Sequence, residues 1–141
     1  MDEIPLIQKL EDIVIGQKKF FDLIVTESML NDFATLSGDK NPLHMDENYA
    51  KSNNFKTRVC HGMLLASFFS RLVGMYIPGQ NSLYFSQSLK FLHPCYVNDR
   101  IEIRGEVMDK SLATKIVTLK TTIIKDKCTI VDGMGKVIVR N

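Results

Sequence analysis

Several residue types are scarce in this 141-residue sequence, which has no tryptophan, four prolines and three cysteines. The cysteines are odd in number and lack the spacing of metal ligands, so we expect free thiols in a reducing cytoplasm. Neither sign of charge dominates, because 18 Lys and Arg residues against 16 Asp and Glu residues leave a net charge of +2. Bulk charge therefore gives no reason to expect a nucleic-acid partner.

No segment has the composition of a membrane anchor or a secretory signal. The longest nearly apolar stretch, residues 63–77, contains Arg71 and is shorter than the roughly 20 residues that span a bilayer. The chain starts with Asp2, Glu3 and Pro5 rather than with a basic and then an apolar run. We therefore expect a cytoplasmic protein that has no membrane partner.

The residues that are present are typical of one globular domain. Hydrophobic residues make up 45% of the chain and charged residues 24%, close to the average for soluble proteins. No Pro-, Gly- or Ser-rich linker, internal repeat or low-complexity run divides the sequence. The prediction is a single domain over residues 1–141 that is large enough to fold without a disulfide or metal.

Helical spacing and capping residues predict three helices, at residues 27–37, 46–51 and 61–77. Thr26 is placed to cap the first helix and Gly38 to end it, while Asp46 can cap the second. The third is mostly apolar, which predicts a long helix buried on nearly all sides. Polar loops are expected between them, at residues 39–44 and 53–59.

Alternation of apolar and polar residues predicts strands at residues 18–25, 82–93, 101–107, 117–123 and 129–139. In the second of these, Leu83, Phe85, Leu89 and Phe91 are expected to face one way, with Gln87 as the odd polar member. One strand, then helices, then four successive strands predict an α+β fold. In such a fold an antiparallel sheet packs one face against a central helix.

Asp39 and His44 flank a proline-stiffened turn that can point both side chains into one space. A carboxylate and a neutral imidazole that share a water can remove and return its protons, as general acid–base catalysis requires. However, Gly, Asp, Asn and Pro are ordinary turn formers, and Asp39 can simply make an Asx-turn. On these residues alone we favour the turn interpretation.

Gly62 lies where the apolar helix over residues 61–77 is expected to begin. The first amides of a helix have no partner within it and carry the positive end of its dipole. Without a Cβ, Gly62 lets an acyl group approach these amides, which could then hold a thioester oxygen as negative charge develops. The alternative is that the glycine only permits close packing of the helix on the sheet.

Other polar residues allow a structural and a functional interpretation. Ser70 and Gln87 are either hydrogen-bonded core residues or pocket residues. Lys56 and Arg58 are either solvated charges or contacts for the phosphates of a nucleotide-bearing substrate. Cys60 next to a histidine is a poor candidate for a nucleophile, since sequence neighbours seldom face each other productively. No metal-ligand set, Walker loop or dinucleotide fingerprint occurs, so we expect no metal and no bound cofactor.

Two longer motifs resemble a known enzyme family. Residues 33–44, Phe-Ala-Thr-Leu-Ser-Gly-Asp-Lys-Asn-Pro-Leu-His, resemble the hydratase 2 motif of MaoC-like dehydratases. Residues 61–70 resemble the central helix of (R)-specific enoyl-CoA hydratases, and further matches occur at residues 78–79, 84–91 and 94–99. Because the first motif is long and specific, the resemblance reverses the preference for a mere turn.

The resemblance implies a hot-dog fold, in which an antiparallel sheet wraps around a long central helix, and a homodimer. It implies reversible hydration of trans-2-enoyl thioesters to (R)-3-hydroxyacyl thioesters. Coenzyme A or carrier pantetheine is then part of the substrate, so no separate cofactor is implied. Because the two-repeat members of the family take the bulky acyl groups, this single short hot dog suggests short or medium acyl chains.

The family's catalytic residues carry over onto matching positions of this sequence. Asp39 and His44 match the catalytic pair, which by this resemblance binds one water. Asp39 acts as the base, and His44 positions the water and shares the proton transfer. Gly62 matches the residue whose backbone amide polarises the thioester carbonyl.

Three further residues match positions that the family uses for its loop and its pocket. Asn41 matches an amide that shapes the catalytic loop and is a candidate to contact His44. Ser70 matches a pocket serine, and Val73, one turn further along the helix, would help to bound the acyl chain. The resemblance therefore assigns Asn41, Ser70 and Val73 to substrate binding.

Three alternatives to an enoyl-CoA hydratase share the expected fold. A 3-hydroxyacyl-[acyl carrier protein] dehydratase uses the same pantetheine arm, so the active-site motif does not separate it from an enzyme that acts on coenzyme A thioesters. A hot-dog thioesterase attacks the carbonyl instead of the alkene, and the intact Asp39–His44 loop argues against it. A non-catalytic acyl-thioester sensor would normally bring a DNA-binding segment, which this sequence does not contain.

Overall fold

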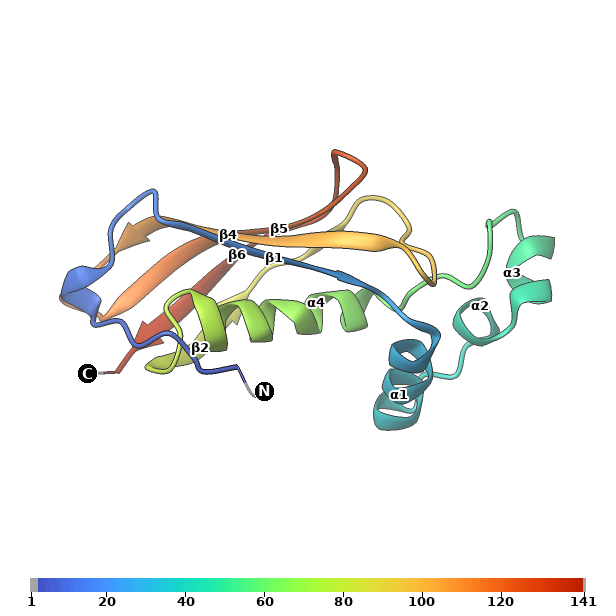
Figure 1. Ribbon diagram of the computed structural model, residues 1–141, viewed down its shortest axis with the longest axis horizontal. Helices are drawn as coiled ribbons and strands as arrows, with labels where there is room; N and C mark the ends of the chain where they lie inside the picture. Colours follow the sequence, from blue (N-terminus) through green and yellow to red (C-terminus); the bar gives the residue numbers. More distant parts are fainter. Residues whose placement is uncertain (1–2, 141) are drawn as a thin grey trace.

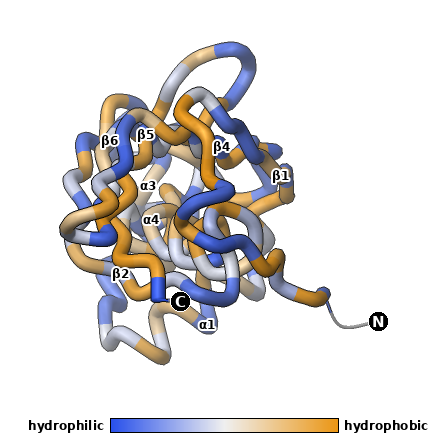
Figure 2. The backbone as a smooth tube through the Cα atoms, turned by 90° about the vertical axis from the view of Figure 1, so that its left-hand side faces the viewer, coloured by the Kyte–Doolittle hydropathy of each residue, from blue (hydrophilic) through white to orange (hydrophobic). Residues whose placement is uncertain are grey.

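The computed structural model describes residues 3–140, and all pairs of strands in its sheet are antiparallel. The strands are β1 (Lys18–Ile24), β2 (Ser82–Gln87), β3 (Lys90–Phe91), β4 (Arg100–Lys110), β5 (Ile116–Lys125) and β6 (Cys128–Val139). Their order is β1-β4-β5-β6-β2, and β3 pairs with β6 outside this order. Helix α4 (Gly62–Arg71) runs along one face of the sheet, which curves around it (Figures 1 and 2). The α+β prediction is confirmed.

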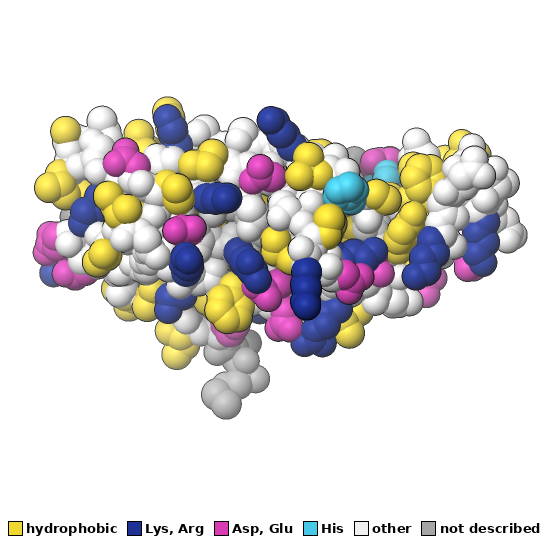
Figure 3. Space-filling model, turned by 90° about the horizontal axis from the view of Figure 1, so that it is seen from above, with side chains coloured by type: hydrophobic (Ala, Val, Ile, Leu, Met, Phe, Trp, Pro, Cys, Tyr) yellow, Lys and Arg dark blue, Asp and Glu magenta, His cyan; other side chains and the backbone are white. Residues whose placement is uncertain are grey.

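Alternation along the strands explains why the sheet has one apolar and one polar face. In β4, Ile101, Ile103 and Val107 are buried, whereas Arg104 between them is exposed. The outer face of the sheet carries basic and acidic side chains side by side (Figure 3). This mixture matches the nearly balanced charge of the whole sequence.

The remaining helices are η1 (Leu10–Asp12), α1 (Glu27–Ser37), α2 (Pro42–Met45), α3 (Glu47–Ser52) and the π-helical η2 (Leu72–Tyr76). The predicted caps are confirmed, because Thr26 accepts a hydrogen bond from Met29 N and Asp46 accepts one from Tyr49 N. Gly38 ends α1 in the left-handed conformation that favours glycine. Among the described residues, no helix is both long enough and apolar enough to cross a membrane.

The central helix differs from its prediction in two ways. The α-helix ends at Arg71, and the chain continues through Tyr76 as a π-helical turn. The expected burial on nearly all sides is wrong, since Met63, Ser67 and Ser70 are exposed while Leu65 and Phe69 are buried. The physical reason is that the sheet of this chain covers only one side of the helix.

Strand β2 also departs from the expected alternation. Leu83 and Phe85 are exposed, but Gln87 lies with Tyr84, whose hydroxyl donates a 2.6 Å hydrogen bond to Gln87 Oε1. A bulge between Tyr84 and Ser86 shifts the register against β6. The prediction that Gln87 shares a face with Leu83 and Phe85 is therefore wrong, because a bulge reverses the alternation beyond it.

Candidate active site

A short helix presents His44 where the sequence predicted only a loop. The Asn41 side chain accepts a 3.0 Å hydrogen bond from Leu43 N, and Pro42 occupies the first turn, where its missing amide hydrogen costs nothing. The Asp39 carboxylate accepts a hydrogen bond from Asn41 N at 3.2 Å. Asp39 therefore makes the predicted Asx-turn, and the same turn starts the helix that carries His44.

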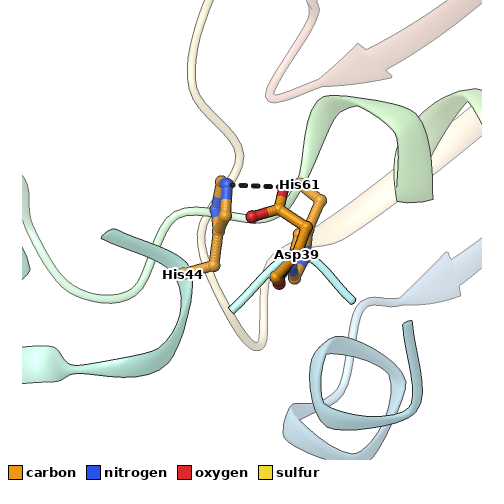
Figure 4. A group of neighbouring side chains, drawn as sticks. All are labelled: Asp39, His44 and His61. Atoms are coloured by element: carbon orange, nitrogen blue, oxygen red, sulfur yellow. Dashed lines mark hydrogen bonds and ion pairs between the residues drawn. The ribbon is translucent and has the colours of Figure 1, made fainter. Parts of the chain in front are cut away.

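The carboxylate of Asp39 and the imidazole of His44 face each other, with 3.7 Å between Asp39 Oδ2 and His44 Nε2 (Figure 4). The other ring nitrogen of His44, Nδ1, lies 2.7 Å from the carbonyl oxygen of Val59. Because a carbonyl only accepts, His44 Nδ1 carries the hydrogen, and Nε2 of the neutral ring is left with its lone pair directed at Asp39. The predicted pair is thus brought together with both inner atoms able to accept a proton.

A second histidine, His61, lies behind this pair and was not predicted as a site residue. Its ring stacks on His44 with 4.0 Å between centroids, and its Nε2 lies 3.0 Å from the carbonyl oxygen of Asp39. Burial lowers the pKa of His61, which keeps its imidazole neutral. The sequence signal was its position directly before Gly62, at the start of the apolar helix.

Arg58 is a buried support of the site, so its interpretation as a solvated charge is wrong. Its guanidinium donates to the His44 carbonyl oxygen at 2.6 Å, to Glu27 Oε1 at 3.0 Å and to Asn31 Oδ1 at 2.8 Å. These bonds tie the end of α2 to α1. A guanidinium supplies five donors in a fixed fork, which suits it to such a junction.

Gly62 is the first residue of α4 and shares a cavity of about 360 Å³ with His44. Phe91 forms another wall, and a Cβ at Gly62 would lie 3.0 Å from its ring. The helix dipole and the unpaired first amides point their positive end toward this cavity. The structure therefore places the predicted oxyanion residue beside the predicted acid–base pair.

The three predicted substrate-binding residues lie in different environments. Ser70 is exposed on α4 and lines a second cavity, of about 460 Å³, with Phe33 and Tyr84. Asn41 is exposed, and its side chain caps α2. Val73 is 1% exposed in the hydrophobic core and is not among the residues that line either cavity. A role for each in substrate binding stays a prediction.

Comparison with known proteins places this geometry in a family. The model of the MaoC like domain matches residues 13–128. The chain belongs to the MaoC-like family. It is 38% identical over 129 residues to the (R)-specific enoyl-CoA hydratase of Rhodospirillum rubrum, covering 92% of this chain and 90% of that protein.

Two further relatives extend the comparison of this MaoC-like chain. The solved (R)-hydratase from A. caviae superposes with a TM-score of 0.89 at 36% identity, covering 92% of this chain and 99% of that one. The mitochondrial 3-hydroxyacyl-[acyl-carrier-protein] dehydratase of Arabidopsis thaliana is 38% identical over 115 residues, covering 77% of this chain and 67% of that protein. The predicted resemblance and the hot-dog fold are confirmed.

In this MaoC-like site, Asp39, His44 and His61 could also hold a metal ion. Each offers one ligand atom, and these atoms all lie within 4.8 Å of one another. The bonds of His44 Nδ1 and His61 Nε2 to carbonyl oxygens leave one free nitrogen on each ring. The expectation that the chain needs no metal stays a prediction.

The buried thiol next to the site is not poised for nucleophilic chemistry. Interaction with Cys95 and burial raise the pKa of Cys60 far above that of a free thiol. A protonated, buried thiol is a poor nucleophile. The structure thus agrees with the expectation that the sequence pair Cys60–His61 is not a catalytic dyad.

Proposed function

We propose that this protein catalyses the reversible, (R)-specific hydration of trans-2-enoyl-CoA to (R)-3-hydroxyacyl-CoA, and is thus a hydro-lyase. The observation that carries the proposal is the Asp39 carboxylate facing His44 Nε2 at 3.7 Å beside the first amide of α4. The relatives named (R)-specific enoyl-CoA hydratase, which align over most of the chain, support the same reaction.

In the proposed reaction, one water lies between Asp39 Oδ2 and His44 Nε2 and donates a hydrogen bond to each. Asp39 takes a proton as the water oxygen adds to Cβ of the enoyl group, and His44 orients the water and shares the transfer. A proton returned by the pair adds to Cα on the same face. One water is consumed, and both residues end in their starting protonation states.

The amide of Gly62 stabilises the charge that this addition creates. Attack at Cβ pushes electrons through the double bond onto the thioester oxygen, giving an enolate. A backbone N–H at a helix start can donate to that oxygen without any reorganisation. Losing one such donor costs about 2.7–4 kcal/mol of transition-state stabilisation in other enzymes.

We propose short to medium acyl chains, with Ser70 at the wall of the acyl pocket and Val73 behind it. Support comes from the 460 Å³ cavity along α4, which Ser70 shares with Phe33, Met63 and Leu89. The mostly apolar lining fits a hydrocarbon chain. Markedly faster turnover of long-chain enoyl thioesters than of four- to six-carbon ones would contradict this proposal.

The deciding experiment is the hydration of crotonyl-CoA, followed by loss of the enoyl-thioester ultraviolet absorbance. The expected result is activity that Asp39→Asn abolishes and a product that an (R)-specific dehydrogenase oxidises. Release of free thiol without loss of the alkene would identify a thioesterase and overturn the assignment of Asp39 and His44.

A second candidate is the dehydration of 3-hydroxyacyl-[acyl carrier protein]. It is favoured by the Arabidopsis thaliana and Solanum lycopersicum relatives with that name, which are 38% and 36% identical to this chain. The same crotonyl group presented on coenzyme A and on acyl carrier protein separates the two. A value of kcat/KM at least about tenfold higher on the carrier, worth about 1.4 kcal/mol, would identify the dehydratase.

We further propose that two copies of the chain associate through the open side of α4 and strand β2. Met63, Leu83 and Phe85 are 58%, 54% and 62% exposed there, and β2 is the last strand in the sheet order. Exposed apolar side chains along an edge strand mark an interface.

Light scattering is expected to give the mass of a dimer for the wild type and the mass of a monomer for Phe85→Glu. Leu112→Glu, at an equally exposed leucine on the β4–β5 connection, should leave the dimer intact.

We also expect the protein to work in a reducing compartment such as the cytoplasm. Cys60, Cys95 and Cys128 are all free thiols. Free thiols are usual where glutathione and thioredoxin keep cysteines reduced.

A further inference from the structure

His61 is a buried polar residue that the proposed mechanism does not yet use. Its side chain is 1% exposed, and its Nδ1 has no hydrogen-bond partner among the described residues. Buried polar atoms without partners are rare because they lose their hydration without compensation. The other contacts of His61 account for its burial at this cost.

Those contacts join three separate segments of the site. Nε2 of His61 donates to the carbonyl oxygen of Asp39 at 3.0 Å, so the neutral tautomer carries its hydrogen on Nε2 and its lone pair on Nδ1. The ring stacks on His44 with 4.0 Å between centroids and 27° between the planes, and Phe33 meets it edge-on with 4.9 Å between centroids. His61 directly precedes Gly62, so its carbonyl group is bonded to the Gly62 amide nitrogen.

We propose that His61 is a positioning residue of the hydration site. Its Nε2–H fixes the backbone of Asp39, and its ring supports the ring of His44. Both catalytic side chains are thereby held in register with the first amide of α4. This inference rests on the proposed hydration, because it assigns His61 to the geometry of that reaction.

The contacts also explain why His61 is an imidazole and not another donor. During proton transfer His44 gains positive charge, and a neutral aromatic ring stacked on it tolerates that charge. A lysine or arginine in the same place would repel it. An aliphatic residue would fill the space but leave the Asp39 carbonyl oxygen without this bond.

Three substitutions separate the two contacts. His61→Gln keeps an N–H donor near the position of Nε2 but loses the ring, His61→Phe keeps the ring but loses the donor, and His61→Ala loses both. We expect kcat for crotonyl-CoA to fall about 10- to 100-fold in each of the first two, and further in the third. We expect KM to change by less than about threefold, because displacing the catalytic groups reduces the stabilisation of the transition state and leaves substrate binding nearly unchanged.

The matched control is Ile13→Val. Ile13 is also 1% exposed, but it directly follows η1. Helix η1, the short dark-blue helix of Figure 1, lies at the end of the sheet opposite α1 and α2. This variant should lose stability and keep its kcat. If the His61 variants keep wild-type kcat per folded molecule, or if KM rises while kcat is unchanged, His61 has no positioning role.

A readout without turnover separates this inference from the proposed function. The stacked ring should shift the NMR resonances of the His44 ring protons, so they are expected to move in His61→Gln and to stay close to their wild-type positions in His61→Phe. A wild-type protein that does not hydrate crotonyl-CoA would overturn the proposed function. Unmoved His44 resonances in His61→Gln would overturn the positioning role, whatever the activity.

Discussion

At the scale of single residues, Asp39 and His44 are expected to behave as one unit because both hold the same water. Asp39→Asn and His44→Ala should each lower kcat/KM about 10²- to 10⁴-fold, the usual range for a general acid–base group. The double variant should lose little more than either single one, as is found for groups that act together. Steady-state hydration rates provide the measurement, and losses that multiply would contradict a shared water.

The backbone at Gly62 permits a test that leaves both acid–base residues unchanged. A methyl group there would lie 3.0 Å from Phe91, so that Gly62→Ala pushes the ring aside and crowds the amide. Because a displacement of about 1 Å can cost on the order of 100-fold, we expect kcat to fall about 10- to 100-fold.

Gly74 is the matched control, since a Cβ built there meets nothing within 4 Å. Gly74→Ala should keep both kcat and the thermal midpoint near wild type. Equal activity of Gly62→Ala and Gly74→Ala would show that a methyl group at position 62 does not obstruct the approach of the substrate to the amide.

The residues that sequence reasoning missed carry no periodic signal. Asp39, His44 and Gly62 could be proposed as site residues because they match the motifs of a known family, whereas turn and helix-start chemistry alone left a structural interpretation open for each. The roles of Arg58 and His61 depend on tertiary contacts. The partners of Arg58 are Glu27 and Asn31, which precede it by 31 and 27 positions. The partner of His61 is Asp39, 22 positions before it. Neither partner can be inferred from the local sequence, so their supporting roles appear only in the fold.

At the scale of elements, capping chemistry predicted helices more accurately than alternation predicted β2. The caps at Thr26 and Asp46 act within a few residues of chain, where local chemistry decides. The bulge in β2 arises in the pairing of Tyr84 and Ser86 with Val137 and Lys136 of β6, which lie far along the chain. Sequence alternation alone does not reveal such a bulge.

The two glycines of β6 give a graded prediction for this region. A Cβ at Gly133 would lie 1.9 Å from the backbone oxygen of Ser88, whereas one at Gly135 would lie 2.7 Å from the side-chain oxygen of Gln87. A side chain can move aside more cheaply than a backbone. We expect Gly133→Ala to lower the free energy of unfolding by about 2–3 kcal/mol and Gly135→Ala by about 1 kcal/mol. Urea unfolding measures both, and the reverse order would contradict the packing of Gln87 against β6.

At the scale of the whole molecule, the alternation of β4, β5 and β6 determines a continuous core under one sheet. Val107, Val117, Leu119, Ile123 and Val137 are fully buried in it. The sequence predicted this core, because period-two alternation over long strands is a strong signal. It did not predict that the central helix keeps an open side, since an apolar residue at an interface looks like an apolar residue in a core.

The stability of the molecule should fall in mild acid because of His61. Burial lowers the pKa of this imidazole, with further lowering by His44 and Arg58, against the opposing effects of the Asp39 carbonyl and carboxylate. The unfolded chain binds a proton near the ordinary pKa of 6.5, and the folded chain binds it only at lower pH. The contribution of His61 to the free energy of unfolding is therefore at its maximum above about pH 6.5. As the pH falls below that value, the free energy of unfolding decreases by at most about 1.4 kcal/mol per pH unit for one proton.

Urea unfolding between pH 7.5 and 5.5 measures this slope. It should become shallower in His61→Gln and stay unchanged in the control His93→Gln, because the side chain of His93 is exposed. Equal slopes in the wild type and His61→Gln would show that His61 accepts its proton in the folded state as readily as in the unfolded one.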